Sequence, residues 1–261
     1  MRVGASTLFR PADQVGAVNE LIEMGLGIKD IELSLPFGPP WDELEELKAL
    51  KGEHGLDYSV HAPFVYDDLA HPHPKMREIY KSQAREAIDF AHELGSTLVV
   101  VHPGHMILEY LLPDVEAFAA LRLPKERYLE NSISSLRELA AYAKSRGVKL
   151  SVENLLEIGQ DHNDIGRLLA EVPDLGLTLD VGHANLTGNL KVYLESFPER
   201  MISLHLHDND GRRDLHWPLG RGVIDFRWLM NELRGSDKRL ILELYSKDDI
   251  RRSFAYLNKM I

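Results

Sequence analysis

Six successive apolar segments of this sequence each end in a side chain that can bind a divalent metal. In chain order these residues are His61, His102, Glu153, Asp180, His205 and Glu243. Each one alone has an ordinary interpretation, as a hydrogen-bonded core histidine or as one half of a buried ion pair. Buried carboxylates are costly unless they are paired or bound to metal, and several at one end of a sheet repel one another. A divalent cation removes that repulsion, so the set predicts a metal site.

The composition restricts the metals and partners that are compatible with such a site. The sequence has no cysteine, which excludes thiolate ligands and leaves nitrogen and oxygen ligands, suited to Zn, Mn, Mg or Co. The formal charge of −11 counts against a nucleic-acid partner without excluding one. No apolar run approaches the roughly 20 residues that span a bilayer. The first residues also lack a signal-peptide core, so we expect a cytoplasmic protein with no membrane partner.

The six segments belong to a regular alternation of strand-like and helix-like stretches. Short runs rich in β-branched residues predict strands at 2–6, 28–35, 57–63, 97–104, 149–154, 175–183, 201–208 and 239–245. Amphipathic stretches, most of them ending at a glycine, predict helices at 12–25, 42–55, 75–94, 127–147, 165–172, 190–197 and 225–235, with one more after 245.

Eight strand–helix units of this length predict an α/β protein, a single (β/α)8 barrel domain over residues 1–261. An open doubly wound sheet is the alternative, but it usually has fewer strands and a glycine-rich first turn, and the sequence has no GxGxxG. In barrels, catalytic residues come from the carboxyl ends of the strands, where the six metal-capable residues fall. Other histidines carry a weaker signal: His54 and His92, near helix ends, are interpreted as solvated, and His71 and His73 as part of a plain loop. His105 and His162 are uninformative.

The strand ends resemble those of the xylose isomerase-like TIM barrel superfamily, which includes sugar isomerases and epimerases and the endonuclease IV family. The resemblance covers essentially the whole chain. It is carried by the order of seven short motifs: HAPF at His61, VHPG at His102, VEN at Glu153, LDVGHA at Asp180, LHLHD at His205, DLHWPLGRG at Asp214 and ILEL at Glu243.

The resemblance implies one to three metal ions, depending on the branch. In the isomerase and epimerase branch, one metal is held by residues that match Glu153, Asp180, His205 and Glu243. The endonuclease IV branch uses three metals, and all nine matching positions are filled here: His61, His102, Glu153, Asp180, His183, His205, Asp214, His216 and Glu243. The ligand set therefore does not choose between the branches.

Other features favour the sugar branch. Endonuclease IV relatives usually have DTCH and HLND where this chain has DVGH and HLHD. The loop after the third predicted strand is acidic, with Asp67 and Asp68, whereas Arg212, Arg213 and Arg221 follow the seventh. Three arginines suit a sugar phosphate as well as a DNA strand. We therefore expect a divalent-metal-dependent sugar or sugar-phosphate isomerase or epimerase. The alternatives are a zinc-dependent abasic-site endonuclease, with DNA as partner, and a polyol-binding protein without activity.

The resemblance also implies roles for individual residues. Glu153 and Glu243 are expected to exchange protons with a ketose through an enediolate, and His183 to contact a substrate oxygen. The expected substrate contacts are Arg212, Phe64, Trp217, His207 and Asp208, of which Asp208 could also orient a metal ligand. A homo-oligomer is compatible with the sequence but is not indicated by it.

Overall fold

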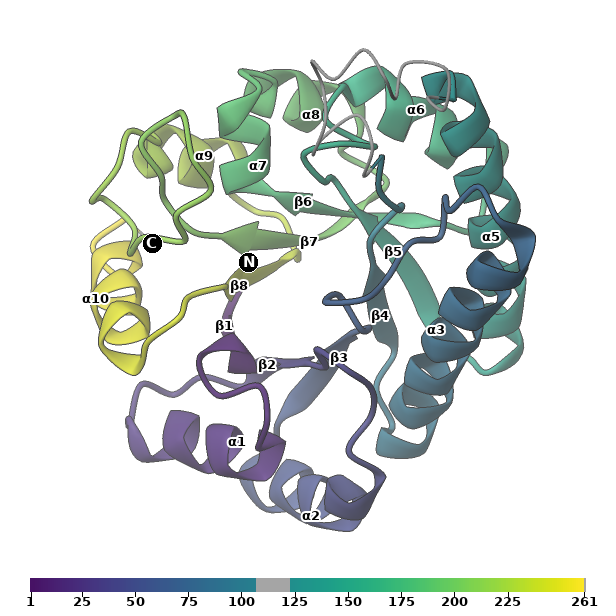
Figure 1. Cartoon of the computed structure of the whole chain (residues 1–261). Helices are drawn as coiled ribbons and strands as arrows, with labels where there is room; N and C mark the ends of the chain where they lie inside the picture. The colour runs from purple at the N-terminus through teal and green to yellow at the C-terminus, as the bar shows by residue number, and fades with distance from the viewer. Residues whose placement is uncertain (107–122, 261) are drawn as a thin grey trace.

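Eight parallel strands close into a barrel in the order in which they occur in the chain (Figure 1). The computed structural model describes residues 1–106 and 123–260. The strands are β1 (Arg2–Ser6), β2 (Asp30–Ser34), β3 (Asp57–His61), β4 (Leu98–Val101), β5 (Lys149–Glu153), β6 (Gly176–Asp180), β7 (Met201–Leu206) and β8 (Arg239–Leu242). The predicted (β/α)8 barrel is thereby confirmed.

Helices surround the barrel on the outside (Figure 1). They are α1 (Gln14–Glu23), α2 (Leu44–His54), α3 (Pro74–Leu94), α5 (Lys125–Ser145), α6 (His162–Glu171), α7 (Val181–Leu186), α8 (Leu190–Ser196), α9 (Phe226–Glu232) and α10 (Lys247–Leu257). Two short 3-10 helices lie at Thr7–Phe9 and Trp41–Glu43. No helix in the described ranges is both long and apolar enough to cross a membrane. Most of the predicted loop from His105 to Lys125 lies outside the described residues.

The predicted sixth strand was too long, and the difference matters for the site. β6 ends at Asp180 instead of at His183, and α7 begins at once. The Asp180 carboxylate accepts a hydrogen bond from the His183 amide at 2.6 Å, which makes Asp180 the N-cap of α7. This cap turns the chain sharply, so His183 lies in the first turn of a helix directly above the strand end.

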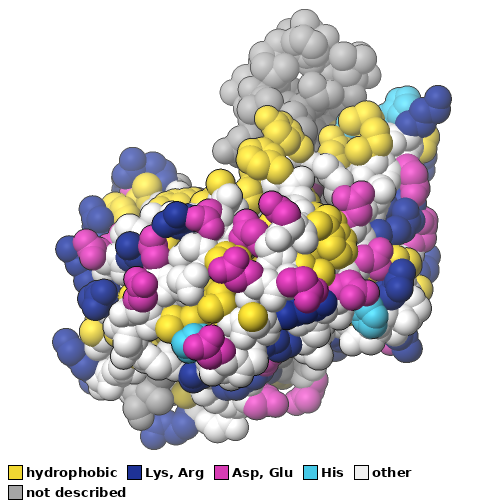
Figure 2. All heavy atoms as spheres, turned by 90° about the horizontal axis from the view of Figure 1, so that it is seen from below, with side chains coloured by type: hydrophobic (Ala, Val, Ile, Leu, Met, Phe, Trp, Pro, Cys, Tyr) yellow, Lys and Arg dark blue, Asp and Glu magenta, His cyan; other side chains and the backbone are white. Residues whose placement is uncertain are grey.

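Charged side chains of both signs are mixed over the face of the molecule seen in Figure 2, with hydrophobic side chains between them. The net charge of −11 is therefore not gathered into one acidic surface on this face. Many of the charged side chains form exposed ion pairs, such as Lys144 with Asp174 at 3.0 Å, and such pairs contribute little stability each.

A partly buried ionic cluster connects the first three strands to the last at the end of the barrel where the strands begin. Arg239 is only 4% exposed and lies 3.4 Å from Asp30, and it also pairs with Asp57. Arg2 approaches the same two carboxylates at 3.2 and 3.0 Å. Burial raises the pKa of Asp30, and the two arginines act against that rise. Removing Arg239 would therefore leave a buried carboxylate without its more buried partner.

We predict that Arg239→Met lowers the free energy of unfolding by about 3 kcal/mol, because it leaves a buried charge poorly paired. The matched control is Arg252→Met, which removes an arginine that is 72% exposed and should change stability by less than about 0.5 kcal/mol. Urea denaturation followed by circular dichroism measures both. Equal midpoints for the two variants would show that the cluster does not stabilise the barrel closure.

Candidate metal centre

Four predicted ligands from neighbouring strands form one buried group at the carboxyl end of the barrel. Glu153, Asp180 and His205 lie on β5, β6 and β7, and Glu243 directly follows β8. All four are buried, and each offers one ligand atom within 4.8 Å of the others. His205 Nδ1 lies 3.2 Å from Glu153 Oε2 and 3.5 Å from Glu243 Oε2. Three carboxylates and one imidazole at this spacing suit a divalent cation with nitrogen and oxygen ligands.

A second group shares Glu153 with the first. It consists of His61 from β3, His102 just after β4, and Glu153. His61 Nε2 lies 3.1 Å and His102 Nε2 3.8 Å from Glu153 Oε2. One carboxylate therefore lies between two sets of potential ligands, as in a site where an oxygen ligand bridges two ions.

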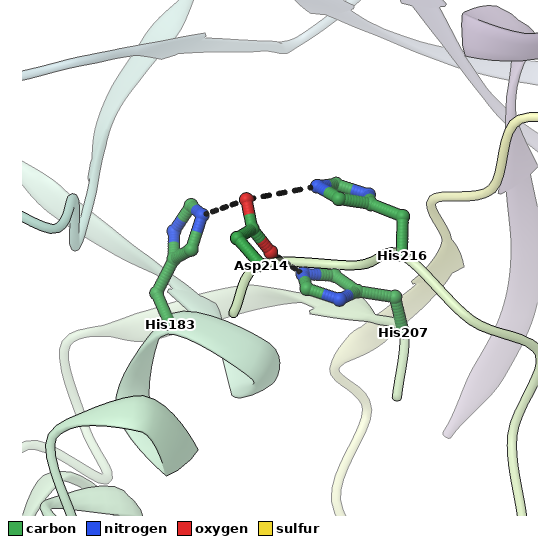
Figure 3. A group of neighbouring side chains, drawn as sticks. All are labelled: His183, His207, Asp214 and His216. Carbon is green, nitrogen blue, oxygen red and sulfur yellow. Dashed lines mark hydrogen bonds and ion pairs between the residues drawn. The ribbon is translucent and has the colours of Figure 1, made fainter. Parts of the chain in front are cut away.

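A third group lies beside the first and is drawn in Figure 3; its members are His183, His207, Asp214 and His216. His183 Nε2 and His216 Nε2 approach Asp214 Oδ2 at 3.2 and 3.3 Å. His183 comes from α7, whereas Asp214 and His216 come from the loop between β7 and α9. His216 has φ 42°, a backbone conformation that costs about 1–3 kcal/mol for a non-glycine residue. The structure thus brings all nine predicted ligands into three adjoining groups.

The histidines in these groups share one feature that fits metal ligands. In His61, His183 and His216, Nδ1 lies 2.9 Å from a backbone carbonyl oxygen, of Ala62, Asn154 and Glu243 respectively. In His102 the Asp67 carboxylate lies at Nδ1, and in His205 the Glu32 carboxylate lies at Nε2 instead. An acceptor on one ring nitrogen fixes the tautomer and leaves the other nitrogen free to bind a cation. In all five rings, the second nitrogen points at the carboxylates of the three groups.

The pKa shifts of the buried histidines reflect the negative charge of the carboxylates around them. Burial favours the neutral imidazole, but Glu153 and Glu32 outweigh it and raise the pKa of His61 to about 9. Carboxylates likewise overcome burial at His183 and His216, raising the pKa to about 10 and about 9. Burial raises the pKa of Glu153, but His205 and His61 lower it well below its usual range. The carboxylates thus retain their charge and require positive charge beside them, which a divalent cation supplies.

Two carboxylates that orient these histidines were missed in the sequence. Glu32 on β2 is fully buried and lies 2.8 Å from His205 Nε2, and it accepts a hydrogen bond from the Ser59 hydroxyl at 2.9 Å. Asp67 lies 3.1 Å from His102 Nδ1. The available signal for Glu32 was a charged residue between the apolar residues Ile31 and Leu33 of the predicted second strand. Asp67 was interpreted only as part of an acidic loop.

His105, which was uninformative in the sequence, contacts two carboxylates in the structure. Its Nε2 lies 3.3 Å from Asp67 and its Nδ1 3.6 Å from Glu157. Burial lowers its pKa, but the two carboxylates outweigh this and raise the pKa to about 10. His105 therefore neutralises Asp67, which in turn contacts His102.

A cavity of about 220 Å³ opens onto the three groups. It is lined by seven of the nine predicted ligands, all except Asp180 and His205. The other lining residues are Leu8, Phe64, Leu155 and Tyr245. Phe64 thus lies where a substrate contact was predicted. Tyr245 was not predicted; its ring is 4.8 Å from that of His216, and burial raises its pKa to about 12. Arg212 and Trp217 are not among the lining residues, and their contact with substrate stays a prediction.

His207 and Asp208 are likewise not among the lining residues, and their contact with substrate stays a prediction. Both are fully buried. The Asp208 carboxylate accepts hydrogen bonds from the amides of Gly220, Gly222 and Ile224 at 3.0, 2.8 and 3.2 Å. Asp208 therefore organises the loop that carries Asp214 and His216. Asp208 thus supports the site from the protein interior, and His207 is buried beside it.

Comparisons with known proteins agree with this fold. Residues 23–260 match the model of the family described as xylose isomerase-like TIM barrel, and the chain belongs to that family. It is 26% identical to a solved structure of a D-tagatose 3-epimerase-like protein, with a TM-score of 0.86 over 100% of this chain and 97% of the other. Several sugar epimerases that are 16–18% identical also share the fold.

Two curated relatives are similar over most of their length. MJ1311 of Methanocaldococcus jannaschii is 27% identical over 90% of this chain and 80% of its own length. A probable endonuclease 4 of Mycobacterium ulcerans is 26% identical over 81% of each chain. The similar proteins thus represent both branches that the sequence resembles. The endonuclease IV branch is represented by a curated relative, and the sugar branch by solved structures of 3-epimerases with this fold.

We predict that Glu32→Gln weakens metal binding by about 10- to 100-fold, because the negative charge beside His205 Nε2 is lost while the size of the side chain is kept. Competition of zinc between the protein and a chelator of known affinity measures the change. Glu45→Gln is the matched control, since Glu45 is 84% exposed on α2. Unchanged affinity in Glu32→Gln would mean that Glu32 has no role in the site.

Proposed function

We propose that this protein is a divalent-metal-dependent isomerase or epimerase of a sugar or sugar phosphate. The observation that carries the proposal is the position of Glu153 and Glu243. Both are buried, both line the cavity, and both belong to the ligand group that also contains Asp180 and His205. Two glutamates that face one small cavity can exchange a proton with a single substrate carbon from two directions.

A divalent cation held by Glu153, Asp180, His205 and Glu243 would polarise the carbonyl of a ketose and the hydroxyl on the adjacent carbon. This would acidify the hydrogen on the carbon that bears that hydroxyl. One glutamate removes that proton and the other returns a proton. Return to the opposite face of the same carbon epimerises the sugar, and return to the neighbouring carbon isomerises it. A carboxylate is a weak base, so this exchange depends on close positioning and on exclusion of water.

The rest of the cavity supports such a substrate. Leu8, Phe64 and Leu155 supply apolar surface that displaces water and packs on a sugar face. His183 and the Tyr245 hydroxyl are polar groups within the same lining, and we assign them contacts with sugar oxygens. Arg212, exposed on the loop after β7, is our candidate for a phosphate contact in a phosphorylated substrate.

Abasic-site endonuclease is the second candidate, and the third ligand group favours it. His183, Asp214 and His216 are within reach of one ion, and an endonuclease 4 relative matches most of the chain. Two or three zinc ions would activate a hydroxide and stabilise the charge of a phosphodiester. An abasic nucleotide would have to leave the duplex to enter a cavity of about 220 Å³.

We predict that the metal-loaded protein exchanges a carbon-bound proton of a ketose with solvent. Incubation of a panel of ketoses and ketose phosphates in D2O, followed by NMR, should reveal deuterium at the carbon that epimerises or isomerises. Glu243→Gln should reduce the exchange at least about 100-fold, because it removes one of the two proton-transfer groups. Metal content is measured in the same samples, so that loss of the ion is not mistaken for loss of the base.

The control for this experiment is again Glu45→Gln, which should exchange at the wild-type rate. A Glu243→Gln protein that retains both its metal and its exchange would contradict the proposed role. Cleavage of a duplex with one abasic site, combined with no exchange on any ketose, would establish the endonuclease instead.

A further inference from the structure

His207 contacts residues of two ligand groups of the candidate metal centre, and its place in the third group is shown in Figure 3. Its Nε2 is 3.1 Å from each carboxylate oxygen of Asp180, which belongs to the first group. Its ring stacks on that of His216 in the third group, with centroids 3.8 Å apart and planes 9° apart. Its Nε2 also lies 3.7 Å from Asp214 Oδ1. His207 is fully buried.

The stacking geometry argues that His207 is not itself a ligand of the third group. The nitrogen lone pairs of two imidazoles lie in the ring planes, so two nearly parallel rings direct them side by side and not toward a common ion. The hydrogen-bonding geometry agrees, since His207 Nε2 is equally close to both oxygens of Asp180. A single N–H that faces both oxygens fixes the rotation of the carboxylate.

Gly182 is the residue that makes room for this ring. It follows Asp180 by two positions, in the first turn of α7. A Cβ at position 182 would lie 2.0 Å from His207 Cε1 and 2.5 Å from both ring nitrogens. A side chain of any size at 182 and an imidazole at 207 are therefore incompatible in this arrangement.

We propose that His207, with the space left by Gly182, is a positioning residue that sets the orientation of Asp180 and couples the first ligand group to the third through His216. The inference builds on the proposed metal site, but it concerns the two residues below the ligands. Its hydrogen-bonding part and its packing part are tested separately.

The hydrogen bond is tested with two substitutions of similar size. His207→Gln keeps an N–H donor near the position of Nε2, whereas His207→Leu fills the space without a donor. We expect zinc affinity within about threefold of wild type for Gln and at least about 10-fold weaker for Leu. The absorption bands of bound Co²⁺ should keep their wild-type positions in Gln and shift in Leu, because they report the ligand geometry. Thermal unfolding in the presence of chelator checks that both variants fold.

The packing is tested with Gly182→Ala, His207→Asn and the double variant. We expect Gly182→Ala alone to weaken zinc binding at least about 10-fold, because the new Cβ displaces the ring from Asp180. The shorter Asn vacates that space, so the double variant should bind zinc no more weakly than His207→Asn alone. This pair also serves the first test if His207→Leu does not fold, since Asn is too short to place its N–H at the position of Nε2.

The outcomes separate this inference from the proposed function. Wild-type protein that binds neither zinc nor Co²⁺ overturns both. Wild-type protein that binds metal, with equal affinity and spectra in His207→Gln and His207→Leu, overturns the positioning role alone. Additive losses in the Gly182→Ala, His207→Asn double variant overturn the coupling between the two positions.

Discussion

The crowding of negative charge at one end of the barrel is the constraint on which the rest of this structure depends. Glu32, Glu153, Asp180 and Glu243 are all buried there, each 7% exposed or less. Buried carboxylates at such spacing are stable only with positive charge and hydrogen-bond donors beside them. The histidines supply part of both, which is why their pKa values are raised despite burial. A divalent cation satisfies the same need and suits the geometry of all three groups.

Some of the ligands at this end of the barrel are placed by strand ends and others by loops. Strand ends place Glu153, Asp180 and His205 with little freedom, since parallel neighbours fix their register. The loop after β7 has to bring Asp214 and His216 over the same point. It does so because the Asp208 carboxylate binds three of its amides and the Glu243 carbonyl holds His216. The loop that completes the site is thus anchored to β7 and to the end of β8, the strands that carry two of the first group's ligands.

Periodicity and order predicted the barrel, and with it six metal-capable residues at one edge, because the carboxyl ends of parallel strands lie together. The places of His183, Asp214 and His216 in the ligand set were implied only by the family resemblance, since these residues lie beyond the strand ends. The supporting residues could not be predicted in the same way. Glu32 lies within a strand, and its contact with His205 joins positions 173 residues apart across the barrel interior. His207 and Asp208 follow a predicted ligand and were expected to contact substrate, and Asp208 also to orient a metal ligand. Sequence proximity does not reveal that both are fully buried.

The position of Asp67 in the structure changes the interpretation of the acidic loop after β3 as evidence against a DNA partner. The acidic loop with Asp67 counted against DNA when only the sequence was considered. In the structure, Asp67 is turned inward to His102 and His105, so its charge serves the site and is largely neutralised there. Two of the three loop arginines are also engaged, Arg213 with Asp210 and Arg221 over the Trp217 ring. The charge of these loops therefore distinguishes poorly between a sugar and a DNA duplex as substrate, and the size of the cavity is the better criterion. A space of about 220 Å³ with Leu8, Phe64, Leu155 and Tyr245 in its lining accommodates a small sugar directly, whereas a duplex gains access only by extruding a nucleotide.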